Sequence, residues 1–143
     1  MSREILLLVD ALARIKPYFD YGHFHAIQQA CAVALDTCDQ YITEQAAIYQ
    51  QRRDVLLSGL EKNGWGRTIK NRGTMFSWQI VPQKFQKMGS VEFCMNLAEK
   101  TGVSFFPGGG FGAEGEGFVR IALVEPEARI TEACRRIGDF LKA

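Results

Sequence analysis

The chain has 143 residues, of which 47% are hydrophobic and 23% are charged, and this composition is ordinary for a globular protein. The length is sufficient for one domain with a buried core. The formal net charge is +1, which gives no indication of a nucleic acid or an anionic membrane as a partner. No apolar run reaches the roughly 20 residues that a membrane-spanning helix needs, and we expect no signal peptide.

Cysteine and histidine residues give no sign of a metal site. Four cysteines are spread along the chain without C-x-x-C spacing: Cys31, Cys38, Cys94 and Cys134. An even number permits disulfides, but a chain of this size with a full apolar core does not need them. We therefore expect reduced thiols in a cytoplasmic protein. His23 and His25 stand alone, and we interpret them as capping or surface polar residues rather than metal ligands.

The first half of the chain reads as three helices. Apolar residues at helical spacing predict a helix over residues 2–16, with Ser2 as its cap and Pro17 ending it. Residues 16–25 are then expected to be irregular. An alanine-rich helix should follow over residues 25–35, and a long one over residues 39–63.

The long helix is expected to bury one stripe of side chains and to end at glycine. The predicted stripe consists of Tyr41, Ile42, Ala46, Tyr49, Val55, Leu56 and Leu60. Asn63-Gly64 supplies the left-handed cap. The basic pairs Arg52-Arg53 and Arg135-Arg136 are interpreted as solvent-exposed helix charges.

The second half alternates between strands and helices. Strands are predicted over residues 74–81, 103–106 and 118–124. A helix over residues 90–100, capped by Ser90, separates the first two, and a last helix opens at Pro126. This order indicates an α+β fold or a fragment of an α/β protein, and we expect a small, mainly antiparallel sheet flanked by helices and preceded by a helical segment.

A glycine-rich loop over residues 107–117 literally contains G-x-G-x-x-G, from Gly110 to Gly115. A dinucleotide site needs a helix directly after this motif, but a strand is predicted there, and acidic neighbours would repel a phosphate. We therefore interpret the loop as a flexible connection that also permits close backbone approach. The acids Glu92, Glu99, Glu114 and Glu116 show no catalytic spacing and are expected on solvated faces.

Arg120 is the most informative single residue. It lies in an otherwise apolar strand between Val119 and Ile121, so we expect it to be partly buried. A buried guanidinium needs an anion, and its planar fork suits a carboxylate. The anion is either a ligand or an acid of the chain such as Glu125, and the residues alone leave both possibilities open.

Several segments together resemble the C-terminal region of class I and II aminotransferases, which are pyridoxal-phosphate enzymes of fold type I. The resemblance rests on residues 18–22 (YFDYG), 49–54 (YQQRRD), 73–78 (GTMFSW), 88–93 (MGSVEF), 103–108 (VSFFPG), 111–112 (FG) and 118–123 (FVRIAL). It covers nearly the whole chain in order. The most similar branch contains the alanine and diaminopimelate aminotransferases.

The resemblance implies roles for particular residues. Arg120 matches the arginine that binds the substrate α-carboxylate. Residues 18–22 resemble the stretch that reaches toward the neighbouring subunit's site, and residues 73–78 and 108–112 resemble walls of the substrate cleft. The residues expected to line the site are therefore Tyr18, Tyr21, Gly22, Met75, Phe76, Gly108 and Gly109.

The resemblance also implies what this chain lacks. In the family, a large domain carries the lysine that binds the cofactor, and none of the seven lysines here has the matching context. We expect residues 1–38 to join an absent large domain and residues 39–143 to form the small domain, together one compact unit. No catalytic residue is expected in this chain, and transamination without the lysine is not expected.

Two functions follow as hypotheses. In the first, the chain is the small domain of a pyridoxal-phosphate aminotransferase that acts on an amino acid and a 2-oxo acid as a homodimer. In the second, it is a non-catalytic binding or oligomerisation module derived from such an enzyme. Exposed apolar surface, including residues 6–9, would serve the second hypothesis.

Overall fold

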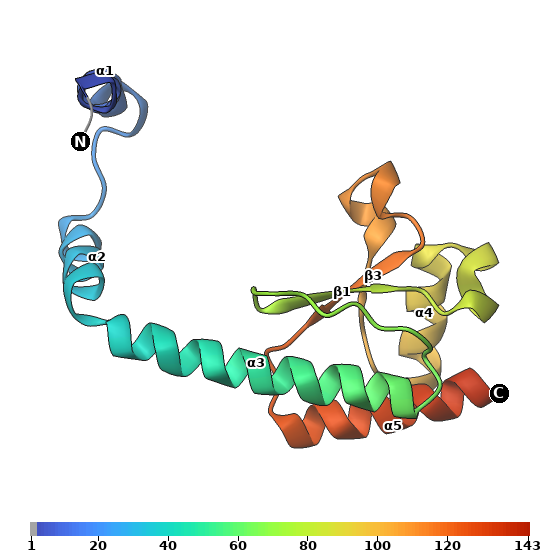
Figure 1. Ribbon diagram of the computed structural model, residues 1–143. Helices are drawn as coiled ribbons and strands as arrows, with labels where there is room; N and C mark the ends of the chain where they lie inside the picture. The colour runs from blue at the N-terminus through green and yellow to red at the C-terminus, as the bar shows by residue number, and fades with distance from the viewer. Residues whose placement is uncertain (1–2) are drawn as a thin grey trace. The chain divides into compact units, whose positions relative to one another are not determined.

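The computed structural model describes residues 3–143 and divides them into two compact units, one ending at Ile42 and the other starting at Thr43 (Figure 1). The sequence had indicated one unit with a division after residue 38. None of the described helices is long and apolar enough to cross a membrane. In chain order the elements are α1 (Arg3–Asp20), α2 (His25–Thr37), α3 (Asp39–Lys62), β1 (Phe76–Ile80), η1 (Gln83–Met88), α4 (Ser90–Thr101), β2 (Phe106–Pro107), η2 (Gly108–Phe111), η3 (Ala113–Gly115), β3 (Phe118–Ala122) and α5 (Glu127–Lys142).

Helix α1 continues through Pro17, where the sequence predicted its end. Pro17 has no N–H, so the carbonyl of Ala13 loses its partner within the helix. Solvent can replace that partner because α1 is exposed. The following turn stays helical, and the Tyr21 N–H donates to the Pro17 carbonyl at 3.2 Å. The prediction of an irregular segment over residues 16–25 was therefore wrong for residues 16–20. Ser2 lies outside the described residues.

A tight turn joins α1 to α2. Tyr21 and Gly22 both have positive φ, 52° and 96°. The Asp20 carboxylate accepts hydrogen bonds from Lys16 Nζ at 2.7 Å and from the Gly22 N–H at 2.9 Å, and these bonds lower the pKa of Asp20. Helix α2 is confirmed with two residues more than predicted. No side chain between residues 3 and 42 is buried.

The second unit contains the sheet, whose strand order is β1-β3-β2 with both pairings antiparallel. Strand β3 is central, so Arg120 lies opposite Trp78 of β1 and Phe106 of β2. The order strand, helix, strand, strand, helix and the α+β class are confirmed.

Strand β2 is shorter than predicted, and it begins three residues later in the chain. Residues 103–105 are irregular, because the Val103 N–H donates to Thr101 Oγ1 at 3.0 Å at the end of α4 rather than to a strand. Phe105 is buried and packs edge-on against Trp65, with ring centroids 6.0 Å apart. Pro107 then ends the ladder because it has no N–H to donate.

One core joins the sheet to helices α3, α4 and α5. It includes Leu56, Leu60, Phe93, Leu97, Val119, Ile121, Ile137 and Phe140. Helices α3 and α5 approach closely, since a Cβ on Gly59 would lie 2.7 Å from Cys134 Sγ. The packing therefore covers the face of β3 that carries Val119 and Ile121 and leaves the opposite face, with Arg120, uncovered by these helices.

Only the later part of the predicted stripe on α3 is buried. Leu56 and Leu60 are buried as expected, together with Leu57, whereas Tyr41, Ile42 and Ala46 are exposed. Helix α3 ends as predicted: Gly64 has a φ of 90°, and the Trp65 N–H donates to the Leu60 carbonyl at 3.0 Å.

Candidate functional site

The uncovered face of the sheet carries a single charged strand residue among aromatic ones. Burial alternates along β1 and β3, so Phe76, Trp78, Phe118 and Arg120 share this face. Phe106 of β2 lies beside Arg120. Arg120 is half-buried, as the sequence predicted. The period of two along a strand therefore places the cation on the face away from the core.

Three aromatic rings surround the guanidinium of Arg120. Its Cζ lies 4.3 Å from the ring centroid of Phe76, 4.4 Å from that of Phe111 and 5.1 Å from that of Phe106. The negative faces of such rings attract a cation and shield it in part from water. Arg120 and these three rings are called the Arg120 cluster below.

Arg120 has no acidic partner among residues 3–143. The expected alternative, an ion pair with Glu125, is wrong, because Glu125 pairs instead with Arg129 at 3.8 Å. No hydrogen bond joins the Arg120 side chain to another described residue, so its donors remain available for a ligand. A guanidinium held by rings and left without a carboxylate can accept an anion from outside.

Further ring contacts fix the orientation of the cluster. Phe111 packs edge-on against Trp78 with centroids 5.6 Å apart and lies 5.8 Å from Phe106. Trp78 stacks on Phe118 at 5.7 Å. Aromatic pairs at these separations stabilise a defined arrangement, so the face is an ordered aromatic surface around one cation.

The turn that carries Phe111 depends on close backbone approach. A Cβ on Gly108 would lie 2.0 Å from the Gly115 carbonyl oxygen, and a Cβ on Gly115 would lie 2.1 Å from that of Gly108. Only glycine fits at either position. The G-x-G-x-x-G sequence includes turn η3, and strand β3 follows it, as expected, so no long helix begins there.

A hydrogen-bonded network fixes the start of the same turn. Glu116 accepts the Ser90 N–H at 2.6 Å through Oε1 and the Ser90 hydroxyl at 3.0 Å through Oε2. Ser90 Oγ accepts the Gly109 N–H at 3.1 Å. Hydrogen bonds from the backbone N–H groups of Ser90 and Gly117 hold the pKa of Glu116 below its ordinary value.

This network corrects one sequence prediction, for Ser90, and adds a structural contact to another, for Glu116. Ser90 does not cap α4 with its side chain; it is the first residue of the helix, after Gly89. Glu116 is exposed, as expected, and its carboxylate also accepts the hydrogen bond that satisfies the N-terminus of α4. Neither contact has a local sequence signal, since the two residues lie 26 positions apart.

Comparison with known proteins places the chain in a family. The family model described as "Aminotransferase class I and II" matches residues 7–137. The chain belongs to the class I and II aminotransferases. The family resemblance and the fold predicted from the sequence are both confirmed.

Individual relatives of the family support this assignment. The glutamate-pyruvate aminotransferase AlaC of Escherichia coli is 41% identical over 136 residues, which are 95% of this chain and 33% of the relative. The LL-diaminopimelate aminotransferase of Halothermothrix orenii is 42% identical over 132 residues, with 92% and 33% covered. Substrate-bound BacF of Bacillus subtilis superposes with a TM-score of 0.83 at 28% identity, covering 92% of this chain and 33% of BacF. The chain spans about a third of the length of these relatives.

The residues expected to line an aminotransferase site fall in both units. Gly108 and Gly109 belong to turn η2, and Phe76 contacts Arg120 directly. Met75 precedes β1, with its carbonyl accepting the Leu123 N–H at 2.8 Å. The other three residues, Tyr18, Tyr21 and Gly22, are exposed in the first unit.

The residues around Arg120 do not fit pyridoxal phosphate, the cofactor of this family. Its aldehyde needs a lysine amine. The described contacts of Arg120 are all aromatic. Lysines with described contacts in the second unit are engaged elsewhere: Lys70 with Asp54, Lys84 over Phe85 and Lys100 over Phe140. No chemical step through the cofactor can be assigned to these residues.

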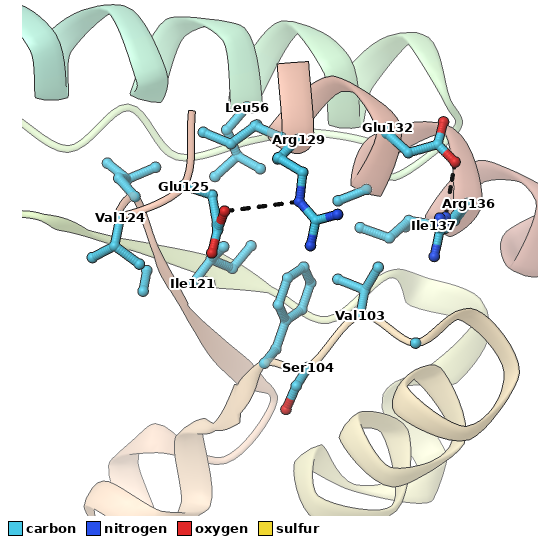
Figure 2. Close-up of a pocket in the computed structure, with 16 residues that line it drawn as sticks. Leu56, Val103, Ser104, Ile121, Val124, Glu125, Arg129, Glu132, Arg136 and Ile137 are labelled. Atoms are coloured by element: carbon cyan, nitrogen blue, oxygen red, sulfur yellow. Dashed lines mark hydrogen bonds and ion pairs between the residues drawn. The ribbon is translucent and has the colours of Figure 1, made fainter. Parts of the chain in front are cut away.

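A separate pocket of about 320 Å³ lies between the end of β3 and helix α5 (Figure 2). Its apolar lining includes Leu56, Val103, Ile121 and Ile137. The charged residues at the pocket pair with each other: Glu125 with Arg129 at 3.8 Å and Glu132 with Arg136 at 2.8 Å. The arginines of this pocket are therefore already paired with carboxylates, whereas Arg120 is not, and the Arg120 cluster is the better site for an anion.

Other candidate residues have structural contacts. The expectation that Arg52 and Arg53 are solvent-exposed was wrong: their side chains are 20% and 12% exposed. Arg52 donates to the carbonyls of Leu123 and Val124 at 3.1 Å, and Arg53 donates to that of Asn71 at 3.1 Å. These bonds hold α3 against segments that flank the sheet. Arg135 and Arg136 are exposed, as predicted.

The histidines and cysteines form no cluster suited to a metal within the described chain. His23 lies 3.5 Å from Asp20, and His25 lies 3.0 Å from Gln29 Nε2. All four cysteines are free, with those in the second unit, Cys94 and Cys134, buried.

Proposed function

We propose that this chain is the C-terminal part of a pyridoxal-phosphate-dependent aminotransferase, which moves an amino group between an amino acid and a 2-oxo acid. In this proposal Arg120 binds the α-carboxylate of the substrate. One observation carries the assignment: the Arg120 guanidinium is half-buried among three rings and has no carboxylate partner among the described residues.

The chemistry of both substrates supports this role for Arg120. Amino acids and 2-oxo acids share an α-carboxylate, and the guanidinium fork can bind its two oxygens in parallel. Charge-assisted hydrogen bonds of this kind contribute about 1.5–3 kcal/mol each. The rings of Phe76 and Phe111, with centroids 4.3 Å and 4.4 Å from Cζ, shield the guanidinium in part from water.

The names of the relatives are consistent with this substrate class. The relatives above are described as acting on glutamate and pyruvate or on LL-diaminopimelate, which all carry an α-carboxylate. Arg120 recognises the part that these compounds share. The choice of amino donor depends on groups that contact the rest of the substrate.

The remaining expected residues complete the proposal. Tyr18, Tyr21 and Gly22 would line the site of a neighbouring subunit in a homodimer in the cytoplasm. Phe76 and its neighbour Met75 would form one wall, and Gly108 and Gly109 another. The cofactor and its lysine would belong to a large domain outside this chain, so the chain alone is expected to have no transaminase activity.

The direct test is to titrate the chain with pyruvate and to monitor the NMR signal of the Arg120 Nε–Hε group during the titration. A saturable shift with a dissociation constant of about the millimolar range is expected for one small carboxylate. Arg120→Gln should abolish binding, whereas Arg135→Gln, which removes an exposed arginine of α5, should leave it unchanged. Equal binding by Arg120→Gln and the wild type would overturn the assignment.

A second titration tests the expected absence of cofactor chemistry. The chain is incubated with pyridoxal phosphate and reduced with borohydride, and adducts are located by peptide mass spectrometry. We expect no stoichiometric adduct. A single saturable adduct on one lysine would contradict the proposal that the cofactor lysine lies outside this chain.

An alternative is a non-catalytic binding or oligomerisation module. The observation that favours it is the exposed apolar surface of the first unit, where Leu7, Leu8 and Leu12 are each more than half exposed. Sedimentation velocity distinguishes the two. Concentration-dependent association without any pyruvate binding would support the module, and a monomer that binds pyruvate would support the enzyme fragment.

A further inference from the structure

The ring of Phe111 differs from the other two rings of the Arg120 cluster in how it is held. Phe76 and Phe106 lie on strands whose pairing with β3 fixes their backbone. Phe111 lies at the end of the short turn η2, flanked by Gly110 and Gly112. The third ring therefore depends on whatever holds this turn.

Gly109 forms backbone hydrogen bonds through both its carbonyl and its N–H. Its carbonyl accepts the Gly112 N–H at 3.2 Å, which closes the turn around Phe111. Its own N–H donates to Ser90 Oγ at 3.1 Å. A Cβ at position 109 would lie 2.5 Å from Glu116 Oε2, so the turn is pressed against the carboxylate.

The Ser90 hydroxyl both donates and accepts a hydrogen bond in this arrangement. A hydroxyl has one proton to donate, and here it goes to Glu116 Oε2 at 3.0 Å while a lone pair accepts from Gly109. Ser90 itself is completely buried, whereas Glu116 is exposed, so water reaches the carboxylate but not the hydroxyl. Two consecutive hydrogen bonds therefore connect the Gly109 N–H to the Ser90 hydroxyl and the hydroxyl to the Glu116 carboxylate.

The Glu116 carboxylate is directed away from Arg120. It binds the first N–H of α4 and the Gly117 N–H, and it forms no ion pair with Arg120. Its negative charge is thereby satisfied at a helix N-terminus. The Glu116 carboxylate therefore does not compete with a ligand carboxylate for the Arg120 guanidinium.

We propose that Ser90 and Glu116 are positioning residues for carboxylate binding at Arg120, because they hold the Gly108–Phe111 turn so that the Phe111 ring stays against the guanidinium. This inference rests on the proposed function. It adds two residues that touch neither substrate nor Arg120 and act through Phe111.

Ser90→Ala is the informative variant, because it separates positioning from helix capping. It removes the hydroxyl and so frees Gly109, but it keeps the bond from the Ser90 N–H to Glu116 that satisfies α4. Thr101→Ala is the matched control. Thr101 has a hydroxyl at the other end of α4, with bonds to Leu97 and Val103 and none to the turn.

The test is the pyruvate titration of the full 143-residue chain, with NMR contacts between the Phe111 ring and the Arg120 side chain as a second measurement. Ser90→Ala should weaken pyruvate binding about fivefold, the effect of losing one net hydrogen bond, and should weaken the Phe111–Arg120 contacts. Ser90→Thr, which keeps a hydroxyl, should restore both. Thr101→Ala should change neither.

The outcomes separate this inference from the proposed function. If the wild type binds pyruvate through Arg120 and Ser90→Ala binds it equally well, or no worse than Thr101→Ala does, the positioning role is wrong and the carboxylate site stands. If the wild type and Arg120→Gln give the same response to pyruvate, the carboxylate site itself is wrong. In that case the role proposed for Ser90 and Glu116 in binding is wrong as well.

Discussion

The two units of the chain both contain helices but differ in burial. Residues 3–42 form helices α1 and α2 and the first turn of α3, and no side chain among them is buried. From Thr43 onward, three helices and a sheet enclose a core that includes Leu60, Phe93 and Leu97, each 0% exposed. Apolar spacing is enough to specify a helix, but burial also requires a surface of matching shape to pack against.

The two units also differ in whether they hold side chains in an ordered arrangement that could bind a ligand. The second unit presents an ordered face because its strands hold Phe76, Phe106 and Arg120 at fixed positions. The first unit contributes exposed tyrosines, Tyr18 and Tyr21, without a neighbouring group that fixes their side chains among the described contacts. A binding site for a small carboxylate is therefore expected in the second unit.

Thiol reactivity should give the largest difference between the units. Burial raises the pKa of Cys134 to about 11, and burial together with the charge of Glu116 raises the pKa of Cys94 to about 11, whereas Cys31 is exposed. With a chromogenic disulfide reagent at pH 8, Cys94 and Cys134 should react at least about 100-fold more slowly than Cys31. Urea should remove this protection. Four equally fast thiols in native buffer would contradict the burial of the second unit.

The same leucine-to-alanine substitution should lower the free energy of unfolding much more in the second unit than in the first. Leu60→Ala leaves a cavity in the core and should lower the free energy of unfolding by about 2–5 kcal/mol. Leu8→Ala, at a helical position that is 71% exposed, should change it by less than about 0.5 kcal/mol. Urea unfolding followed by circular dichroism measures both. A comparable loss for Leu8→Ala would mean that this side chain is buried in solution.

Two alanine substitutions within one turn should differ in their effect on the stability of the second unit. Gly108→Ala forces a Cβ against the Gly115 carbonyl and should destabilise the second unit by about 2 kcal/mol. Gly110→Ala meets no atom within 4 Å and should have little effect. The midpoint of urea unfolding compares the two variants. Equal stability would show that the backbones of Gly108 and Gly115 are not in contact.

Acid should weaken the second unit slightly through Glu132. Hydrogen bonds from Arg135 and Arg136 lower the pKa of this carboxyl from 4.5 to about 2. Because the folded state binds the proton more weakly than the unfolded state, the stabilisation is present above about pH 4.5 and is lost as the pH falls toward 2. Glu132→Gln should flatten this part of the stability profile. The effect is small because the ion pairs are exposed.

The sequence predicted the fold well where local pattern decides. The order of elements, the end of α3 at Gly64 and the face of β3 that carries Arg120 all follow from short-range spacing. The continuation of α1 through Pro17 was missed, because an exposed helix can tolerate an unpaired carbonyl that water hydrates. Strand β2 was misplaced because two residues of pairing give almost no periodic signal.

The candidate site was predictable only in part. Arg120 stood out because a cation in an apolar strand is unusual, and Phe76 came from family resemblance. The ring of Phe111 and the Ser90–Glu116 network were missed, because they meet only after residues far apart in the chain fold together. Alternating aromatic residues in β1 were the one local signal that an aromatic face would form.

The most direct test compares pyruvate with pyruvamide, its neutral analogue, in NMR titrations of the whole chain. We predict that pyruvate shifts the Arg120 Nε–Hε signal and the neighbouring signals of Phe76 and Phe111, while pyruvamide does not and the signals of residues 3–42 respond to neither. Equal shifts with both compounds would contradict a carboxylate site at Arg120. So would pyruvate shifts centred on Arg129 and Arg136 in the pocket beside α5.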